Sequence, residues 1–132
     1  MWRSAPELTR GGDLKIEGES VDLISTDPLY AKEFLPLWDD LAVFAARVLK
    51  PNGILVTYTG QFYLNRVFAS LDKHLTYCWT NSQSWEGKRN QIRQMKINSG
   101  WKPMLVYSKG EWKARCPWSD SFHGTDKQKD GH

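Results

Sequence analysis

A chain of 132 residues that is 40% hydrophobic and 25% charged has the composition of one globular domain, which excludes a disordered or low-complexity protein. No apolar run approaches the roughly 18 residues that a membrane-spanning helix needs, and the first residues lack the apolar segment of a signal peptide. We therefore expect a single cytoplasmic domain over residues 1–132 with no membrane partner, and the net charge of +3 adds no exclusion by itself.

The charge is distributed unevenly along the chain. Residues 1–40 hold four lysines and arginines against nine acidic residues, whereas residues 87–115 hold eight basic residues against the single acid Glu111. This asymmetry indicates either a polyanionic partner or a solvated basic face. The spacing of Cys78, Cys116 and the three histidines is typical of neither a disulfide framework nor a metal site, so we expect no bound metal.

The first predicted strand covers residues 20–26, which are apolar at three of seven positions. It runs directly into Asp27-Pro28, and the proline prevents continuation as a central strand. From residue 31 to residue 50, apolar side chains recur at steps of three and four, which predicts an amphipathic helix. Its regular part is expected to begin near Leu35, because Pro36 is tolerated only in a first turn.

A second strand is predicted at residues 54–58, after a helix stop and turn at Lys50-Pro51-Asn52-Gly53. This strand is apolar enough to be buried on both faces. Gly60 ends it, and a second amphipathic helix then extends to about residue 74.

A third strand is predicted at residues 75–79 and a fourth at residues 104–107. Residues 81–103 between them are polar and basic, which predicts a long loop or an irregular hairpin. Residues 111–132 have little periodicity and are expected to form an irregular tail.

Alternating strands and helices predict an α/β fold with a parallel sheet covered by helices. In such sheets, ligands bind beyond the carboxyl ends of the strands. The tetrapeptide Asp27-Pro28-Leu29-Tyr30 follows the first strand and is therefore placed where a site is expected.

With this motif, the chain resembles the DNA methylases that modify adenine N6 or cytosine N4, whose signature is Asp/Ser/Asn-Pro-Pro-aromatic after such a strand. The resemblance covers roughly residues 14–110 and extends to Arg47-Val48-Leu49-Lys50-Pro51-Asn52-Gly53 and to Gly100-Trp101-Lys102-Pro103-Met104-Leu105-Val106-Tyr107. It implies an incomplete Rossmann-like sheet of the S-adenosylmethionine (SAM)-dependent methyltransferases, with about four strands and two main helices. Leu29 stands where the family usually has a second proline.

The resemblance implies catalytic roles for Asp27, Pro28, Leu29 and Tyr30. The carboxylate of Asp27 and the carbonyl of Pro28 would accept hydrogen bonds from the amino group of an extruded base, and Tyr30 would stack on that base. Asp27 would thereby localise the amine lone pair as positive charge develops. An aspartate in the first position is more typical of adenine N6 enzymes than of cytosine N4 enzymes.

The resemblance also implies SAM as the methyl donor, although the sequence has no glycine-rich turn of the kind that holds it. Asp27 is one candidate for contact with the cofactor, and the other cofactor-binding residues are unassigned. In one permuted class of the family the catalytic motif comes first and the cofactor motif last. We therefore expect a chain truncated before the cofactor half, as a shortened gene, a cut expression product or a remnant of a mobile element.

DNA is the partner that the resemblance implies, and residues 81–103 fall where the family contacts its target. The residues expected to hold phosphates or stack bases are Trp85, Lys88, Arg89, Arg93, Lys96, Trp101 and Lys102. Truncation would leave the first strand with an unpaired edge, which predicts a homodimer or a complementing cofactor half. The alternatives are a non-catalytic DNA-binding or regulatory module and a remnant that only folds.

Overall fold

The structure, a computed structural model, describes residues 16–28, 32–86, 90–92, 95–112 and 117–124. In chain order the elements are β1 (Val21–Thr26), the 3-10 helix η2 (Lys32–Phe34), α2 (Pro36–Val48), β2 (Leu49–Tyr58), α3 (Leu64–Asp72), β3 (Thr76–Trp85), β4 (Asn90–Ile92), β5 (Ile97–Ser99), β6 (Trp101–Ser108) and β7 (Ser121–Gly124).

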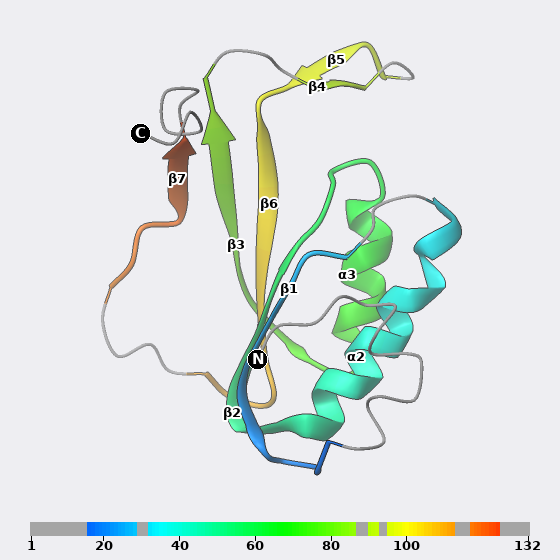
Figure 1. Cartoon of the computed structure of the whole chain (residues 1–132), viewed down its shortest axis with the longest axis vertical. Helices are drawn as coiled ribbons and strands as arrows, with labels where there is room; N and C mark the ends of the chain where they lie inside the picture. The colour runs from blue at the N-terminus through cyan, green and yellow to red at the C-terminus, as the bar shows by residue number, and fades with distance from the viewer. Residues whose placement is uncertain (1–15, 29–31, 87–89, 93–94, 113–116, 125–132) are drawn as a thin grey trace.

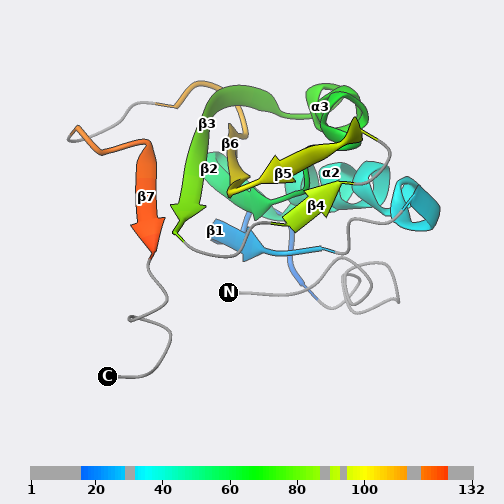
Figure 2. The ribbon, with the colours of Figure 1, turned by 90° about the horizontal axis from the view of Figure 1, so that it is seen from above.

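Five strands form one sheet in the order β1-β2-β6-β3-β7. The pairs β1–β2 and β3–β7 are parallel, whereas β6 runs antiparallel to both of its neighbours. Helices α2 and α3 lie on one face of this sheet, and the β4–β5 hairpin projects beyond one end of it (Figures 1 and 2). The predicted α/β fold with two main helices is confirmed, but the sheet is mixed and not wholly parallel, because β6 runs antiparallel between β2 and β3.

The core lies between the two helices and the sheet. The apolar stripe of α2 and two side chains of α3 are buried against the middle strands, as the helical periodicity predicts. The fully buried side chains of this layer include Leu41, Val48, Leu55, Val67, Leu71, Leu105 and Tyr107. Helix α2 begins at Pro36, close to the expected Leu35, because a proline in the first turn gives up no helical hydrogen bond.

The predicted turn at residues 50–53 is part of β2. Leu49, the residue after α2, is already extended and pairs with Val21, so the chain passes from helix to strand without a separate loop. Gly53 makes this close approach feasible. A Cβ at this position would lie 2.9 Å from the carbonyl oxygen of Lys50 and 3.1 Å from that of Asp22.

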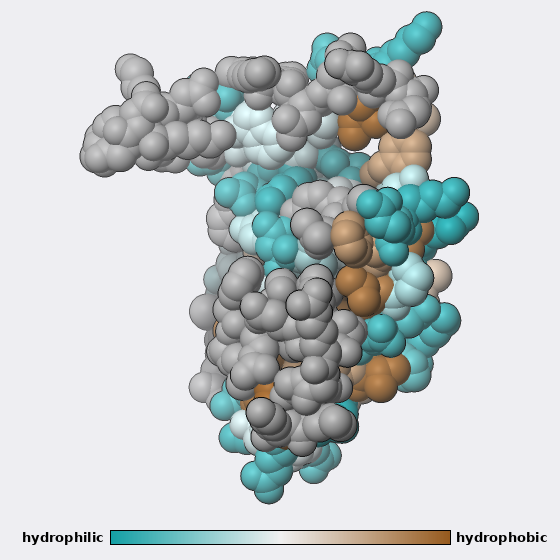
Figure 3. Space-filling model, turned by 45° about the vertical axis from the view of Figure 1, so that its right-hand side comes forward, coloured by the Kyte–Doolittle hydropathy of each residue, from teal (hydrophilic) through white to brown (hydrophobic). Residues whose placement is uncertain are grey.

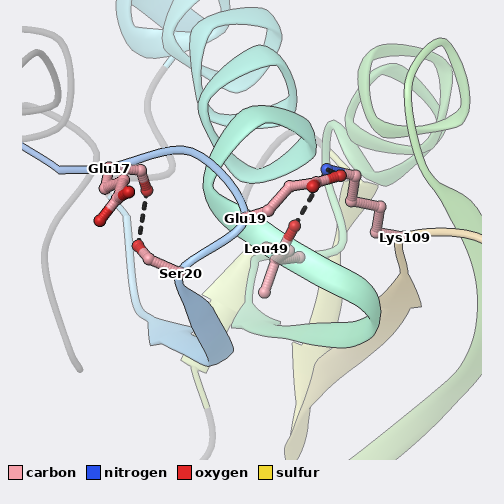
Figure 4. Close-up of polar contacts among 5 residues, drawn as sticks. All are labelled: Glu17, Glu19, Ser20, Leu49 and Lys109. Carbon is pink, nitrogen blue, oxygen red and sulfur yellow. Dashed lines mark hydrogen bonds and ion pairs between the residues drawn. The ribbon is translucent and has the colours of Figure 1, made fainter.

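The segment that leads into β1 is fixed by one lysine after β6. Lys109 Nζ donates to the carbonyl oxygen of Leu49 at 3.0 Å and lies 3.4 Å from Oε1 of Glu19, while Ser20 Oγ donates to the carbonyl oxygen of Glu17 (Figure 4). These contacts join β6, β2 and the start of β1, and so help to set the register that places the end of β1 beside β2.

The carboxyl-terminal half of the chain contains more strand than the sequence pattern indicated. Strand β3 continues to Trp85, β4, β5 and the start of β6 also lie within residues 81–103, and β7 pairs with β3 within the predicted tail. Polar residues are tolerated there because β3 obtains its hydrogen bonds from β6 and β7 whatever its side chains are. Short or polar strands of this kind give no apolar alternation.

Candidate functional site

Two strands end and a third begins at the same end of the sheet. β1 and β2 both end there, because Thr26 pairs with Thr57 in a parallel register, and β6 begins there because it is antiparallel. Asp27 follows β1 directly and is exposed, whereas Pro28 is buried. Leu29 and Tyr30, the other two residues of the predicted motif, lie outside the described residues.

A cation lies against Asp27. Lys102 Nζ is 3.5 Å from Asp27 Oδ2 and 4.4 Å from the centroid of the Tyr58 ring. The two charged side chains are 30% and 41% exposed, so this is a partly screened ion pair with a cation–π contact beneath the ammonium. Asp27 follows β1, whereas Lys102 belongs to β6 and Tyr58 to β2, and together these three residues form what we call the edge cluster.

The register of β6 explains why Lys102 reaches Asp27. Tyr58 pairs with Met104, and the N–H of Thr59 donates to the carbonyl oxygen of Pro103 at 3.2 Å. Lys102 therefore lies just beyond the end of β2, and its side chain extends over Tyr58 towards β1. The sequence suggested Lys102 as a DNA contact, and it gave no sign of the contact with Asp27.

The charge of Asp27 in the edge cluster affects the pKa of Tyr58. Partial burial raises the pKa of the Tyr58 phenol above its ordinary value, and the nearby Asp27 carboxylate raises it further. Tyr58 was not among the predicted site residues. Its position at the end of the second strand, beside the motif, is the only sequence signal that could have suggested it.

The geometry of Asp27 suits it to accept hydrogen bonds from an amine. Its carboxylate stands at the end of a strand that is anchored by pairing with β2, and the buried Pro28 that follows has a fixed φ and no N–H. In the folded chain this carboxylate already accepts from an ammonium group. Another amine at the same position could make the same contact after Lys102 moves away.

The two predicted base-stacking tryptophans are brought together. Trp101 at the start of β6 pairs with Ser84 on β3, and the N–H of the next residue, Trp85, donates to the carbonyl oxygen of Gly100 at 3.0 Å. Both tryptophans line an open cavity of about 640 Å³, together with His123 of β7. His123 Nδ1 lies 3.1 Å from Ser84 Oγ, so β7 contributes to the lining of this cavity.

The basic residues predicted to contact DNA are only partly described. Lys96 is exposed on the turn of the β4–β5 hairpin, and Lys102 belongs to the edge cluster. Lys88, Arg89 and Arg93 lie outside the described residues. In the part of the chain that the structure describes, no group of three His, Cys, Asp or Glu side chains could hold a metal ion, and no helix is long and apolar enough to cross a membrane.

Comparisons with known proteins show the same fold. The chain is similar to the cytosine-N4-specific DNA methyltransferase PvuII, with a TM-score of 0.69 and 17% identity over 86% of this chain and 53% of that one. It is similar to a protein of Thermus thermophilus described as a DNA modification methylase, with a TM-score of 0.68 and 17% identity over 93% and 66%. M1.HpyAVI in complex with SAM gives a TM-score of 0.62 and 16% identity over 92% and 63%.

The chain thus spans between about half and two thirds of each of these structures. No protein-family model and no curated protein matches the sequence. At such low identity the structural similarity shows the fold alone.

Among the described residues, no strand ends in a glycine-rich turn, and β1, the strand that Asp27 follows, pairs on one side only. Asp27, the candidate for cofactor contact, forms an ion pair with Lys102. The edge cluster therefore suits the acceptor of a methyl group better than its donor.

Proposed function

We propose that this chain is the catalytic-motif part of a SAM-dependent DNA methyltransferase that acts on an exocyclic amino group. The observation that carries the proposal is the position of Asp27. Its exposed carboxylate lies just beyond the carboxyl end of β1, where ligands of α/β sheets bind, and it already accepts a hydrogen bond from the ammonium group of Lys102. The shared fold with DNA methyltransferase structures supports it.

Asp27 would act on the base and not on the methyl donor. The lone pair of an exocyclic amine is delocalised into the ring, so acceptors on its hydrogens must localise the pair before it can attack. The Asp27 carboxylate and the Pro28 carbonyl would supply those acceptors, and Tyr30 would hold the ring by stacking. Positive charge that develops on the amine would be stabilised by the negative charge of Asp27.

We favour adenine N6 over cytosine N4 as the target, because an aspartate begins the motif. PvuII, which has the same fold, is specific for cytosine N4, so the fold does not decide between them. Methyl transfer to duplexes that contain only one of the two target bases would distinguish the alternatives.

The methyl donor would be held by a complementing cofactor half, and the sheet edge that receives it could also pair with another copy of the chain. Among the described residues β1 pairs only with β2, so its outer edge can accept a further strand. Leu23, on this edge strand, is 42% exposed. Light scattering during size exclusion should detect self-association or a complex with a cofactor half, and a monomer that binds no cofactor half would contradict this part of the proposal.

The decisive experiment measures methyl transfer from SAM to DNA by the chain alone and by the chain with a cofactor half from a methyltransferase of this fold. Turnover is expected only in the complemented reaction and should be abolished by Asp27→Asn. Asp22→Asn is the matched control, since Asp22 lies on the same strand, is exposed and also pairs with a lysine, Lys50. Turnover by the chain alone, or equal turnover by the two variants, would contradict the proposal.

The second candidate function is a DNA-binding module without catalysis. The contact between Lys102 and Asp27 favours it, because the carboxylate proposed to receive the base is already neutralised. DNA binding that persists while no cofactor half restores turnover would identify this function.

A further inference from the structure

A second pocket lies beside the edge cluster but does not include Asp27. It has a volume of about 480 Å³ and is formed between the residues that follow β2 and the β4–β5 hairpin. We call it the hairpin pocket. Its lining includes Gln61, Phe62, Ile92, Met95, Ile97 and Trp101. Figure 3 shows hydrophobic surface in the upper part of the molecule, where Figure 1 places this hairpin.

Three apolar side chains of the hairpin pocket are exposed. Phe62 is 44% exposed, Met95 58% and Ile97 50%. The Phe62 ring is held edge-on by Tyr63, with ring centroids 4.8 Å apart. Exposed apolar residues that converge on one concave site are typical of a binding surface.

Gln61 is the polar group of this pocket, and its orientation is fixed. Its Nε2 lies 2.6 Å from the carbonyl oxygen of Trp101 and 3.0 Å from Ser99 Oγ. Because a carbonyl oxygen can only accept, the atom that contacts it must be the amide nitrogen. Both N–H groups are thereby engaged, and the Oε1 of Gln61 has no hydrogen bond to any residue that the structure describes.

The pocket therefore offers an aromatic wall, apolar walls and one oriented acceptor. A flat heterocycle that carries an amino group fits this set, because the ring can pack on Phe62 or Trp101 while the amino group donates to Gln61 Oε1. Lys96 is exposed and lies in the chain between Met95 and Ile97, two lining residues, so its positive charge is available to a phosphate of the same ligand. Ring, amino group and phosphate together describe a nucleotide.

We propose that the hairpin pocket holds an unpaired nucleobase next to the one at Asp27, and that Gln61 selects a base with an exocyclic amino group. This inference rests on the proposed DNA substrate and adds a specificity-determining residue. Cytosine would donate from its amino group to Gln61 Oε1. Thymine presents a carbonyl oxygen at that position, so two acceptors would face each other.

Fluorescence anisotropy with labelled single-stranded oligonucleotides tests the inference, with oligo-dC compared with oligo-dT of the same length. The full chain should bind oligo-dC about tenfold more tightly, since one well-placed hydrogen bond to a base contributes that much discrimination. Gln61→Leu should remove the preference by weakening the binding of oligo-dC and strengthening that of oligo-dT, because leucine neither accepts from the cytosine amino group nor opposes the thymine carbonyl oxygen. Asn65→Leu, which changes an exposed amide on α3 outside the pocket, should keep the preference.

Two further measurements do not depend on the folding of the Gln61 variant. An oligonucleotide in which 2-pyrimidinone replaces cytosine lacks the amino group and should bind the unchanged protein more weakly than oligo-dC. Phe62→Ala should weaken the binding of both oligo-dC and oligo-dT about tenfold, because the stacking of a base on the Phe62 ring is lost.

Equal binding of oligo-dC and oligo-dT, or a preference that survives Gln61→Leu, would overturn the inference. Methyl transfer that depends on Asp27 would then still support the proposed function, so the two failures are distinguishable. If Phe62→Ala instead changes self-association in light scattering and leaves oligonucleotide binding intact, the hairpin pocket is an interface between copies of the chain and the inference is wrong.

Discussion

Lys102 Nζ lies 3.5 Å from Asp27 Oδ2, although 75 residues separate the two in the chain. The contact places a cation on the carboxylate that the motif singles out, above the ring of Tyr58. An amine that approaches Asp27 Oδ2 must share this oxygen with the ammonium or displace it. Lys102 therefore both neutralises the carboxylate and competes with the base for it.

The first prediction concerns Tyr58. Burial is the larger cause of its raised pKa and Asp27 the smaller. Asp27→Asn should therefore lower the pKa of Tyr58 but leave it above the ordinary 10.0. NMR titration of tyrosine labelled in the ring, with the Tyr58 signal assigned from Tyr58→Phe, measures this. Asp22→Asn, at the other end of β1, should leave the pKa unchanged, and an equal shift in both variants would contradict the geometry of the edge cluster.

The second prediction concerns Lys96 and Lys102, both of which the sequence analysis suggested as DNA contacts. Lys96 is exposed on the hairpin, whereas the charge of Lys102 is already paired with Asp27. Lys96→Met should reduce the slope of log affinity against log salt by about 1, the value for loss of one phosphate contact. Lys102→Met should leave the slope unchanged. Anisotropy titrations at several salt concentrations test both, and the opposite pattern would show that Lys102 leaves Asp27 to bind phosphate.

The third prediction concerns Gly53. A Cβ there would meet two backbone carbonyl oxygens at 2.9 and 3.1 Å, and neither can move without disturbing the pairing of β1 with β2. Gly53→Ala should therefore lower the free energy of unfolding by about 1–3 kcal/mol, the usual cost of an overpacked site. Gly18→Ala is the control, because its Cβ would meet the carbonyl oxygen of Arg47 at an ordinary 3.5 Å. In urea denaturation, Gly53→Ala should unfold at a clearly lower urea concentration than Gly18→Ala. Similar midpoints for the two variants would contradict the close approach at Gly53.

The fourth prediction concerns Tyr107, which is fully buried and donates its hydroxyl to Asp72 Oδ1 at 2.7 Å. Tyr107→Phe should lower the free energy of unfolding by about 1–2 kcal/mol at neutral pH, because the hydrogen bond to a carboxylate is lost. Urea denaturation of the variant at neutral pH measures this loss.

The same residue should make stability depend on alkaline pH. Burial first, and the Asp72 carboxylate second, raise the pKa of Tyr107 well above its ordinary 10.0. The folded state thus keeps the neutral phenol, and its contribution is fully present below about pH 10. As the pH rises beyond that value, the unfolded chain ionises first and stability falls. In Tyr107→Phe the free energy of unfolding should fall less steeply with pH above about pH 10. An equally steep fall in the variant and the unchanged protein would contradict this prediction.

The sequence by itself determined the parts of the fold that depend on neighbours in the chain. The apolar periodicity of residues 31–50 placed α2, and the apolar run before Asp27-Pro28 placed β1 and its end. The position of Asp27 at a strand end followed from these local signals. The α/β fold could also be predicted, since the order of strands and helices limits the sheets that can form.

Tertiary structure alone decided the register of the carboxyl-terminal strands and the contacts of the site. Strand β7 and the second half of β3 are polar, and they form because each supplies the other with backbone hydrogen bonds across about 40 residues. The contacts of Lys102 with Asp27 and of Gln61 with Trp101 depend on the antiparallel register of β6 against β2. Because a shift of one residue in that register would turn both side chains to the other face, no local pattern in the sequence could have fixed them.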